Sequence, residues 1–96
     1  MRISFDFDGC LSRPNIREIC KEHISVGDYV RITTSRWENP NTGNNNDMLK
    51  IAEQLGISDI VYTHHTLKNL FMDGIDIHYD DNPNEEDGMN CKFILV

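Results

Sequence analysis

The stretch RISFDFDGCLS, residues 2–12, decides how the rest of the chain is arranged. The apolar run at its start predicts a buried strand, and the strand ends in two carboxylates, Asp6 and Asp8, before Gly9 marks a sharp turn. Side chains alternate along a strand, so residues two apart face the same side. An unpaired buried charge is costly, so the pair indicates a metal, a cationic partner or chemistry. The plain alternative is a strand that runs into a solvated acidic turn.

Outward from this stretch, apolar strand patterns alternate with helical spacing along the chain. We expect strands at about 2–7, 29–34, 59–63, 75–79 and 91–96, helices after Pro14, from Asn46 or Asp47 to Gly56 and over 64–72, and a turn with a short helical piece over 82–86. The segment 35–46, SRWENPNTGNNN, has no apolar period and reads as a loop, which at this length is functional or disordered. Alternation predicts parallel strands with right-handed crossovers. The expected fold is a three-layer α/β/α sandwich with a mostly parallel, five-stranded Rossmann-like sheet.

Length, charge and cysteine content limit the possible functions. Ninety-six residues make one domain, 1–96, without room for a second one. The net charge of −7 argues against an extended nucleic-acid surface, although a few basic residues could still contact a nucleotide. The three cysteines lack C-x-x-C spacing, which favours a reducing compartment. Neither an apolar leader nor a membrane-spanning stretch is evident, so we expect a soluble, cytoplasmic protein without membrane contact.

Polar side chains follow three of the expected strands. Asp6 and Asp8 end the first, TTSR at 33–36 ends the second, and Asp80 and Asp81 end the fourth. The carboxyl ends of parallel strands meet at one edge of a sheet, where ligands bind. Like charges about 4 Å apart repel by roughly 4 kcal/mol at an effective dielectric of 20, so the acids require a counter-charge. Oxygen ligands with room for water and phosphate favour Mg²⁺.

These motifs resemble the haloacid dehalogenase superfamily of phosphotransferases. The resemblance covers nearly the whole chain and follows the family's order. The four matching elements are DFDG at 6–9 after an apolar strand, Thr34 with its neighbour Ser35 at the end of the second strand, Lys68 with Lys50 as the competing choice, and Asp80-Asp81 after the fourth strand. The first and last are specific to the family, the second is less so, and a lone lysine is common.

The resemblance implies a role for each matching residue. Asp6 would be the nucleophile that forms an aspartyl-phosphate, and Asp8 the acid and then the base. Mg²⁺ would be held by Asp6, by the backbone carbonyl of Asp8 and by one of the two acids at 80–81, which the sequence leaves open. The hydroxyls of Thr34 and Ser35 and the ammonium of Lys68 would bind the phosphate. Family members that act on carbon–halogen bonds lack the second acid, so Asp8 favours a phosphatase.

No segment is long enough for the cap domain that many family members carry. The expected site is therefore open, which suits a large substrate, an oligomer or a partner that completes the pocket. Arg36 and Trp37 begin the long loop beside it and are candidate substrate contacts, which makes a nucleotide or a nucleic-acid end a candidate substrate. Two rivals share the acidic metal site: a phospho-receiver signalling domain and a non-catalytic binding protein. In receivers the adjacent acid pair comes early in the chain, whereas here it comes late.

Overall fold

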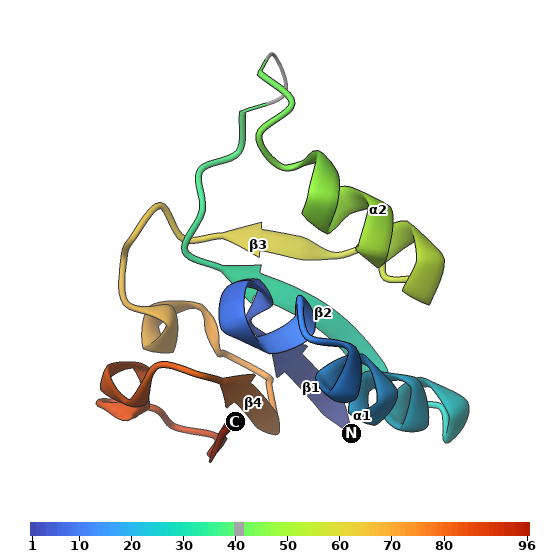
Figure 1. Cartoon of the computed structure of the whole chain (residues 1–96). Helices are drawn as coiled ribbons and strands as arrows, with labels where there is room; N and C mark the ends of the chain where they lie inside the picture. Colours follow the sequence, from blue (N-terminus) through green and yellow to red (C-terminus); the bar gives the residue numbers. More distant parts are fainter. Residues whose placement is uncertain (40–41) are drawn as a thin grey trace.

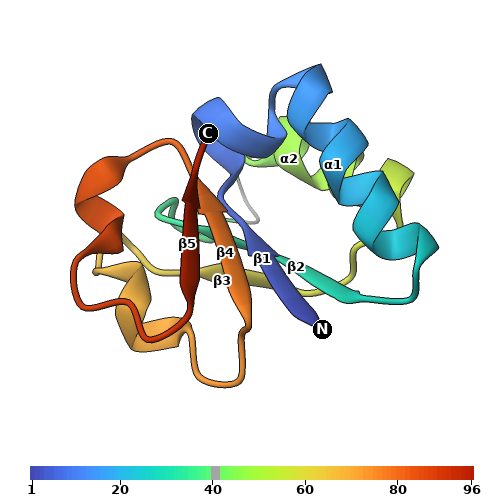
Figure 2. The ribbon, with the colours of Figure 1, turned by 90° about the horizontal axis from the view of Figure 1, so that it is seen from below.

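Five strands pair in parallel to form one sheet, in the order β3-β2-β1-β4-β5 (Figures 1 and 2). They are β1 (Arg2–Phe5), β2 (Tyr29–Thr34), β3 (Ile60–Tyr62), β4 (Ile77–Asp80) and β5 (Lys92–Leu95). The structure is a computed structural model that describes residues 1–39 and 42–96. All five expected strands are confirmed, with bounds that shift by no more than two residues. The α/β class is confirmed as well, with a sheet that is parallel throughout.

Two α-helices, α1 (Pro14–Ser25) and α2 (Asn46–Leu55), lie on one face of the sheet (Figure 2). Pro14 occupies the first helical turn of α1, where its missing N–H costs nothing. Gly56 ends α2 in the left-handed conformation, with φ of 76°. The apolar core lies between these helices and the sheet. It is built from Ile3, Phe5, Phe7, Cys10, Leu11, Ile16, Cys20, Val30, Ile32, Met48, Ala52, Ile57 and Tyr79.

The opposite face of the sheet carries a buried polar chain. The Nε of Arg31 donates to the hydroxyl of Thr33 at 3.1 Å, and that hydroxyl lies 2.7 Å from the hydroxyl of Ser4. The Ser4 oxygen is 3.0 Å from Nδ1 of His78, whose Nε2 is 2.8 Å from Oδ2 of Asp80. All five side chains are buried. Each polar group therefore finds a partner inside the protein, which removes most of the cost of its burial.

The prediction of a helix over 64–72 is wrong. This segment forms turns and one short 3₁₀ helix, η2 (Lys68–Phe71), in which Leu70 is 70% exposed. The segment has to cross from β3 past two strands to β4, over the polar face of the sheet. Polar side chains occupy the centre of that face, which leaves little apolar surface on which an amphipathic helix could pack. Instead the segment covers polar groups: the carbonyl of Phe71 accepts a hydrogen bond from Arg31.

Tight turns complete the chain between these elements. The turn η1 (Phe7–Leu11) follows β1 directly. The short helical piece expected over 82–86 is present as the 3₁₀ helix η3 (Pro83–Glu86), which follows β4. The loop expected over 35–46 is confirmed as irregular in its described parts before α2, and its residues 40–41 lie outside the description. All three cysteines are free thiols. Within the described ranges, the helices are too short and too polar to span a membrane.

Candidate active site

The carboxyl ends of β1, β2 and β4 open into one cleft. The cleft has a volume of about 450 Å³, and all of its lining residues except Pro83 are polar. Three of its walls come from strand ends that are far apart in the sequence but adjacent in the parallel sheet. The lining residues are Asp6, Asp8, Ser35, Lys68, Asp80, Asp81, Asn82, Pro83 and Glu85. The structure thus brings together the acids and the lysine that the sequence singled out.

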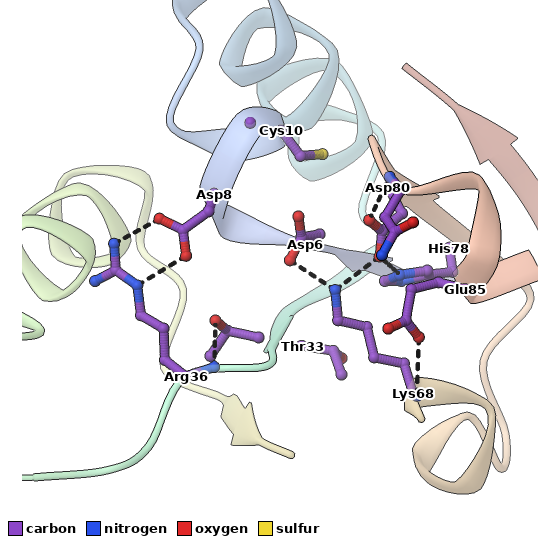
Figure 3. Close-up of polar contacts among 12 residues, drawn as sticks. Asp6, Asp8, Cys10, Thr33, Arg36, Lys68, His78, Asp80 and Glu85 are labelled. Carbon is purple, nitrogen blue, oxygen red and sulfur yellow. Dashed lines mark hydrogen bonds and ion pairs between the residues drawn. The ribbon is translucent and has the colours of Figure 1, made fainter. Parts of the chain in front are cut away.

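Lys68 joins two of the acids at the centre of the cleft (Figure 3). Its Nζ donates to Oδ1 of Asp6 and to Oδ2 of Asp80, each at 2.7 Å, and its side chain is 3% exposed. Burial alone lowers the pKa of this ammonium, but the two carboxylates outweigh it and raise the pKa above its ordinary value. The Lys68 backbone N–H donates to Glu85 at 3.0 Å, which ties η2 to η3. The competing Lys50 lies on the exposed side of α2.

Asp80 is held from three sides. Its Oδ2 contacts both Lys68 and His78, and its Oδ1 accepts the backbone N–H of Asn82 at 3.0 Å. Burial raises the pKa of Asp80, but the hydrogen bond from His78 and the charge of Lys68 outweigh it, so the pKa lies below its ordinary value. Burial lowers the pKa of His78 and favours its neutral form. A neutral His78 that donates through Nε2 leaves Nδ1 to accept from Ser4.

Asp6 has a different electrostatic environment. Burial raises its pKa from 3.8 to about 7, Lys68 opposes this change, and the neighbouring Asp80 and Asp81 add to it. An additional positive charge beside Asp6 would favour its ionised form. A perturbed carboxyl in a cleft, with a named charge partner, is a candidate for catalysis.

This pKa shift predicts how stability depends on pH. In the metal-free protein, the folded state keeps the Asp6 proton up to about pH 7, whereas the unfolded chain loses it near 3.8. The folded state binds more protons between these values, so the Asp6 contribution to the free energy of unfolding is lost as the pH rises through this window. Asp6→Asn should therefore become more stable relative to wild type from about pH 4 to about pH 7, by on the order of a few kcal/mol. Urea denaturation with EDTA measures this, and a pH-independent difference would contradict it.

Asp81 lies beside Asp6 and approaches the backbone of Gly9. Gly9 has φ of +71°, and a Cβ at this position would collide with the Asp81 carboxylate. Both the left-handed conformation and the close approach therefore require glycine at the end of the D-x-D-G sequence. Unlike Asp80, Asp81 is exposed to the cleft.

Three of the carboxylates are arranged to hold a metal ion. Asp6, Asp80 and Asp81 each offer an oxygen, and these oxygens lie within 4.8 Å of one another. An all-oxygen donor set suits a hard cation such as Mg²⁺. Because both oxygens of Asp80 already accept hydrogen bonds from the protein, Asp81 and Asp6 are the acids whose oxygens are most available to an ion.

Asp8 points away from Asp6 and pairs with Arg36 (Figure 3). Its two oxygens accept from Nε and Nη2 of Arg36 at 2.9 and 2.7 Å, and Arg36 also binds Asp47 at the start of α2. The guanidinium lies 4.9 Å from the ring centroid of Phe7. These interactions anchor the long loop to the edge of the cleft. Arg36 would keep Asp47 as a partner if Asp8 swung into the cleft.

The two hydroxyls predicted to bind phosphate lie in different places. Thr34 is fully buried, its oxygen accepts the backbone N–H of Arg36 at 3.2 Å, and it does not line the cleft. Ser35 does line it. Trp37 lies outside the acidic cleft, stacked on His64 with ring centroids 4.3 Å apart. The roles of Ser4 and Thr33 in supporting the site could not be predicted, since only the tertiary structure joins them to Asp80 through His78.

No protein-family model, curated protein or solved structure matches this chain. The chemistry of the site is therefore inferred from its residues and their geometry.

Proposed function

We propose that this protein is a cap-less phosphatase of the haloacid dehalogenase type, in which the short helix η2, rather than an α-helix, forms part of the layer over the second face of the sheet. It hydrolyses a phosphomonoester with the help of Mg²⁺, in the cytoplasm. The observation that carries the proposal is the Lys68 bridge between Asp6 and Asp80, at the bottom of an open cleft that Asp81 also lines. A buried lysine that contacts two carboxylates is positioned to neutralise a nucleophile and an incoming phosphate together.

In the proposed reaction, an oxygen of Asp6 attacks phosphorus and the bond to the leaving oxygen breaks. Asp8 turns from Arg36, takes up a proton from the solvent and delivers it to that oxygen. It then takes a proton from a water molecule that attacks the aspartyl-phosphate, which releases inorganic phosphate and restores the Asp6 carboxylate. The Ser35 hydroxyl and the Lys68 ammonium hold phosphoryl oxygens during both steps. The second step separates this function from that of a receiver, in which the phosphorylated aspartate persists.

A divalent cation would be held by Asp6 and Asp81, with Asp80 and the backbone carbonyl of Asp8 as further candidate ligands. When bound, Mg²⁺ would screen the negative charges of the nucleophile and the phosphoryl group from each other. The Lys68 ammonium is the protein's own contribution to the same task. His78 holds Asp80 in place through Nε2 at 2.8 Å.

The function is tested by hydrolysis of p-nitrophenyl phosphate and a panel of natural phosphomonoesters, with Mg²⁺ and with EDTA. We expect turnover that requires Mg²⁺ and is lost in Asp81→Asn. The exposed acid Glu53 on α2 provides a matched control, and Glu53→Gln should retain full activity. A wild-type protein that is inert on the whole panel with Mg²⁺ would rule the enzyme out.

Thermal denaturation supplies a readout that does not depend on turnover. Mg²⁺ at about 100 times its Kd adds about 2.7 kcal/mol to the free energy of unfolding, which for a domain of this size raises Tm by roughly 13 °C. Glu53→Gln should show the same shift and Asp81→Asn should show little of it. An unchanged wild-type Tm at millimolar Mg²⁺ would contradict the metal site.

A further inference from the structure

A second cavity lies directly beside the acidic cleft. Its volume is about 370 Å³, and it shares Asp8 and Ser35 with the cleft, so the two meet at these residues. Its remaining lining includes Trp37, Asn39 and His65. Its exposed surface is more apolar than that of the cleft, and its polar groups are mainly amides rather than carboxylates. A phosphomonoester with its phosphate in the cleft has to place its leaving group somewhere, and this cavity is adjacent.

Trp37 offers an aromatic surface to this cavity. Its ring stacks on His64 with an interplanar angle of 7° and a centroid distance of 4.3 Å, yet 59% of the residue remains exposed. The Trp37 carbonyl accepts the side-chain amide of Asn45 at 2.8 Å, which fixes the backbone of the loop there. The indole is thus held in place from one side, while much of its surface is free to stack on a flat ligand.

The turn beneath Trp37 has an unusual backbone. His64 and His65 have φ of 53° and 62°, and two consecutive left-handed residues other than glycine are rare. The backbone N–H of Thr63 donates to the backbone carbonyl of Thr34 at 2.8 Å, and that of His65 donates to the backbone carbonyl of Ser35 at 2.9 Å. These two hydrogen bonds tie the turn to the end of β2. This conformation places one imidazole against Trp37 and the other in the cavity lining. Backbone strain of this kind is typical of ligand-binding segments.

The charges of the cavity limit what it can hold. Arg36 is the arginine in its lining, and its guanidinium already pairs with the carboxylates of Asp8 and Asp47. Asp47 would keep its pairing with Arg36 when Asp8 turns into the cleft, so a second phosphate would have to compete with the Asp47 carboxylate for this guanidinium. The side chains of Asn39 and Asn44 are uncharged, and each can both donate and accept hydrogen bonds. The cavity suits a neutral, planar group with a hydrogen-bonding edge.

We infer that this cavity binds the leaving group of the phosphomonoester, and that this group carries a planar heteroaromatic ring, as in a nucleoside monophosphate. The inference rests on the proposed function and names its substrate class. The ring stacks on Trp37, its polar edge faces the asparagine amides, and the sugar passes Ser35 on its way to the cleft. The site takes a single nucleotide in preference to a diphosphate or an oligonucleotide.

Steady-state kinetics compare AMP, GMP, CMP and UMP with ribose 5-phosphate, which has the same phosphate and sugar without the base. Because stacking of one base accounts for a factor of about ten or more, the best nucleotide should exceed ribose 5-phosphate in kcat/KM by at least about tenfold. In Trp37→Ala the ratio of kcat/KM for the nucleotide to that for ribose 5-phosphate should fall towards one. In Trp37→Phe this ratio should be largely retained. Val26→Ala, at an exposed apolar residue on the loop after α1, is the matched control.

Fluorescence measures binding without turnover. Trp37 is the only tryptophan in the chain, so quenching of its emission reports this cavity directly. In Asp6→Asn with Mg²⁺, the preferred nucleotide should quench the emission at concentrations at which ribose 5-phosphate does not. Equal kcat/KM for nucleotides and ribose 5-phosphate, or a preference for a 5′-phosphorylated oligonucleotide, would overturn the inference and leave the phosphatase intact. Failure to hydrolyse any phosphomonoester would instead overturn the proposed function.

Discussion

Asp6→Asn should lower kcat for Mg²⁺-dependent phosphomonoester hydrolysis by roughly 10⁴-fold or more, because an amide cannot form the covalent intermediate. Loss of a residue that takes part in covalent catalysis has effects of this size, whereas loss of a binding contact affects mainly KM. The variant should remain folded, since asparagine has nearly the same shape as aspartate. It also lacks the buried negative charge with which Asp6 destabilises the folded wild type above about pH 7.

Single-turnover and steady-state assays at matched Mg²⁺ measure this loss. Glu53→Gln, which removes one exposed acid from α2, serves as the control and should keep the wild-type kcat. Circular dichroism and Tm establish that Asp6→Asn is folded. If folded Asp6→Asn retained a tenth or more of the wild-type kcat, Asp6 could not be the nucleophile.

Among the variants proposed for this protein, Lys68→Met should lose the most stability. Its free energy of unfolding should fall by about 3–5 kcal/mol at pH 8 without metal. The methionine leaves Asp6 and Asp80 buried without the ammonium that now contacts both at 2.7 Å. A buried charge that loses its only cation is expensive, and the two carboxylates also repel each other. The penalty should shrink as the pH falls, because protonated carboxyls no longer need Lys68.

Urea denaturation with EDTA at several pH values tests this prediction. Lys50→Met is the matched control, because Lys50 lies on the exposed side of α2, and its effect should stay within about 0.5 kcal/mol. Equal losses in the two variants would show that the bridge through Lys68 contributes nothing to stability. A Lys68→Met penalty that did not vary with pH would show that unpaired carboxylates are not its cause.

The strands and the acidic edge of the sheet could be predicted from sequence because their signals are local. A β-branched run such as YVRITT at 29–34 indicates a strand by itself, and parallel pairing then places Asp6 and Asp80 at the same edge. The lysine at 68 was the weakest of the four motifs. Its place between the acids depends on a crossover whose path the local sequence does not reveal.

The remaining differences arise from tertiary structure. Leu67 and Leu70 have helical spacing, but they are exposed, because the sheet face beneath them is polar. That polarity comes from Ser4, Thr33 and His78 on three different strands, and only the sheet register places them together. His78 itself is fully buried, with its Nε2 2.8 Å from Oδ2 of Asp80.

The pairing of Asp8 with Arg36 was equally invisible in the sequence, where 28 residues separate them. The motif predicts that Asp8 faces the same side as Asp6, whereas in the structure Asp8 lines the cleft with its carboxylate turned towards the Arg36 guanidinium. Thr34 also looked like the stronger hydroxyl candidate, but strand alternation turns it into the core and leaves Ser35 at the cleft.

The central claim is that Asp6 is phosphorylated during turnover, and chemical trapping tests it most directly. Protein mixed with substrate and Mg²⁺ is quenched and treated with borohydride, which reduces an aspartyl-phosphate to homoserine, and the peptides are then sequenced by mass spectrometry. We predict homoserine at position 6 in wild type and more of it in Asp8→Asn, in which the second step is impaired. Hydrolysis without homoserine at position 6, or with the modification at another residue, would contradict the account.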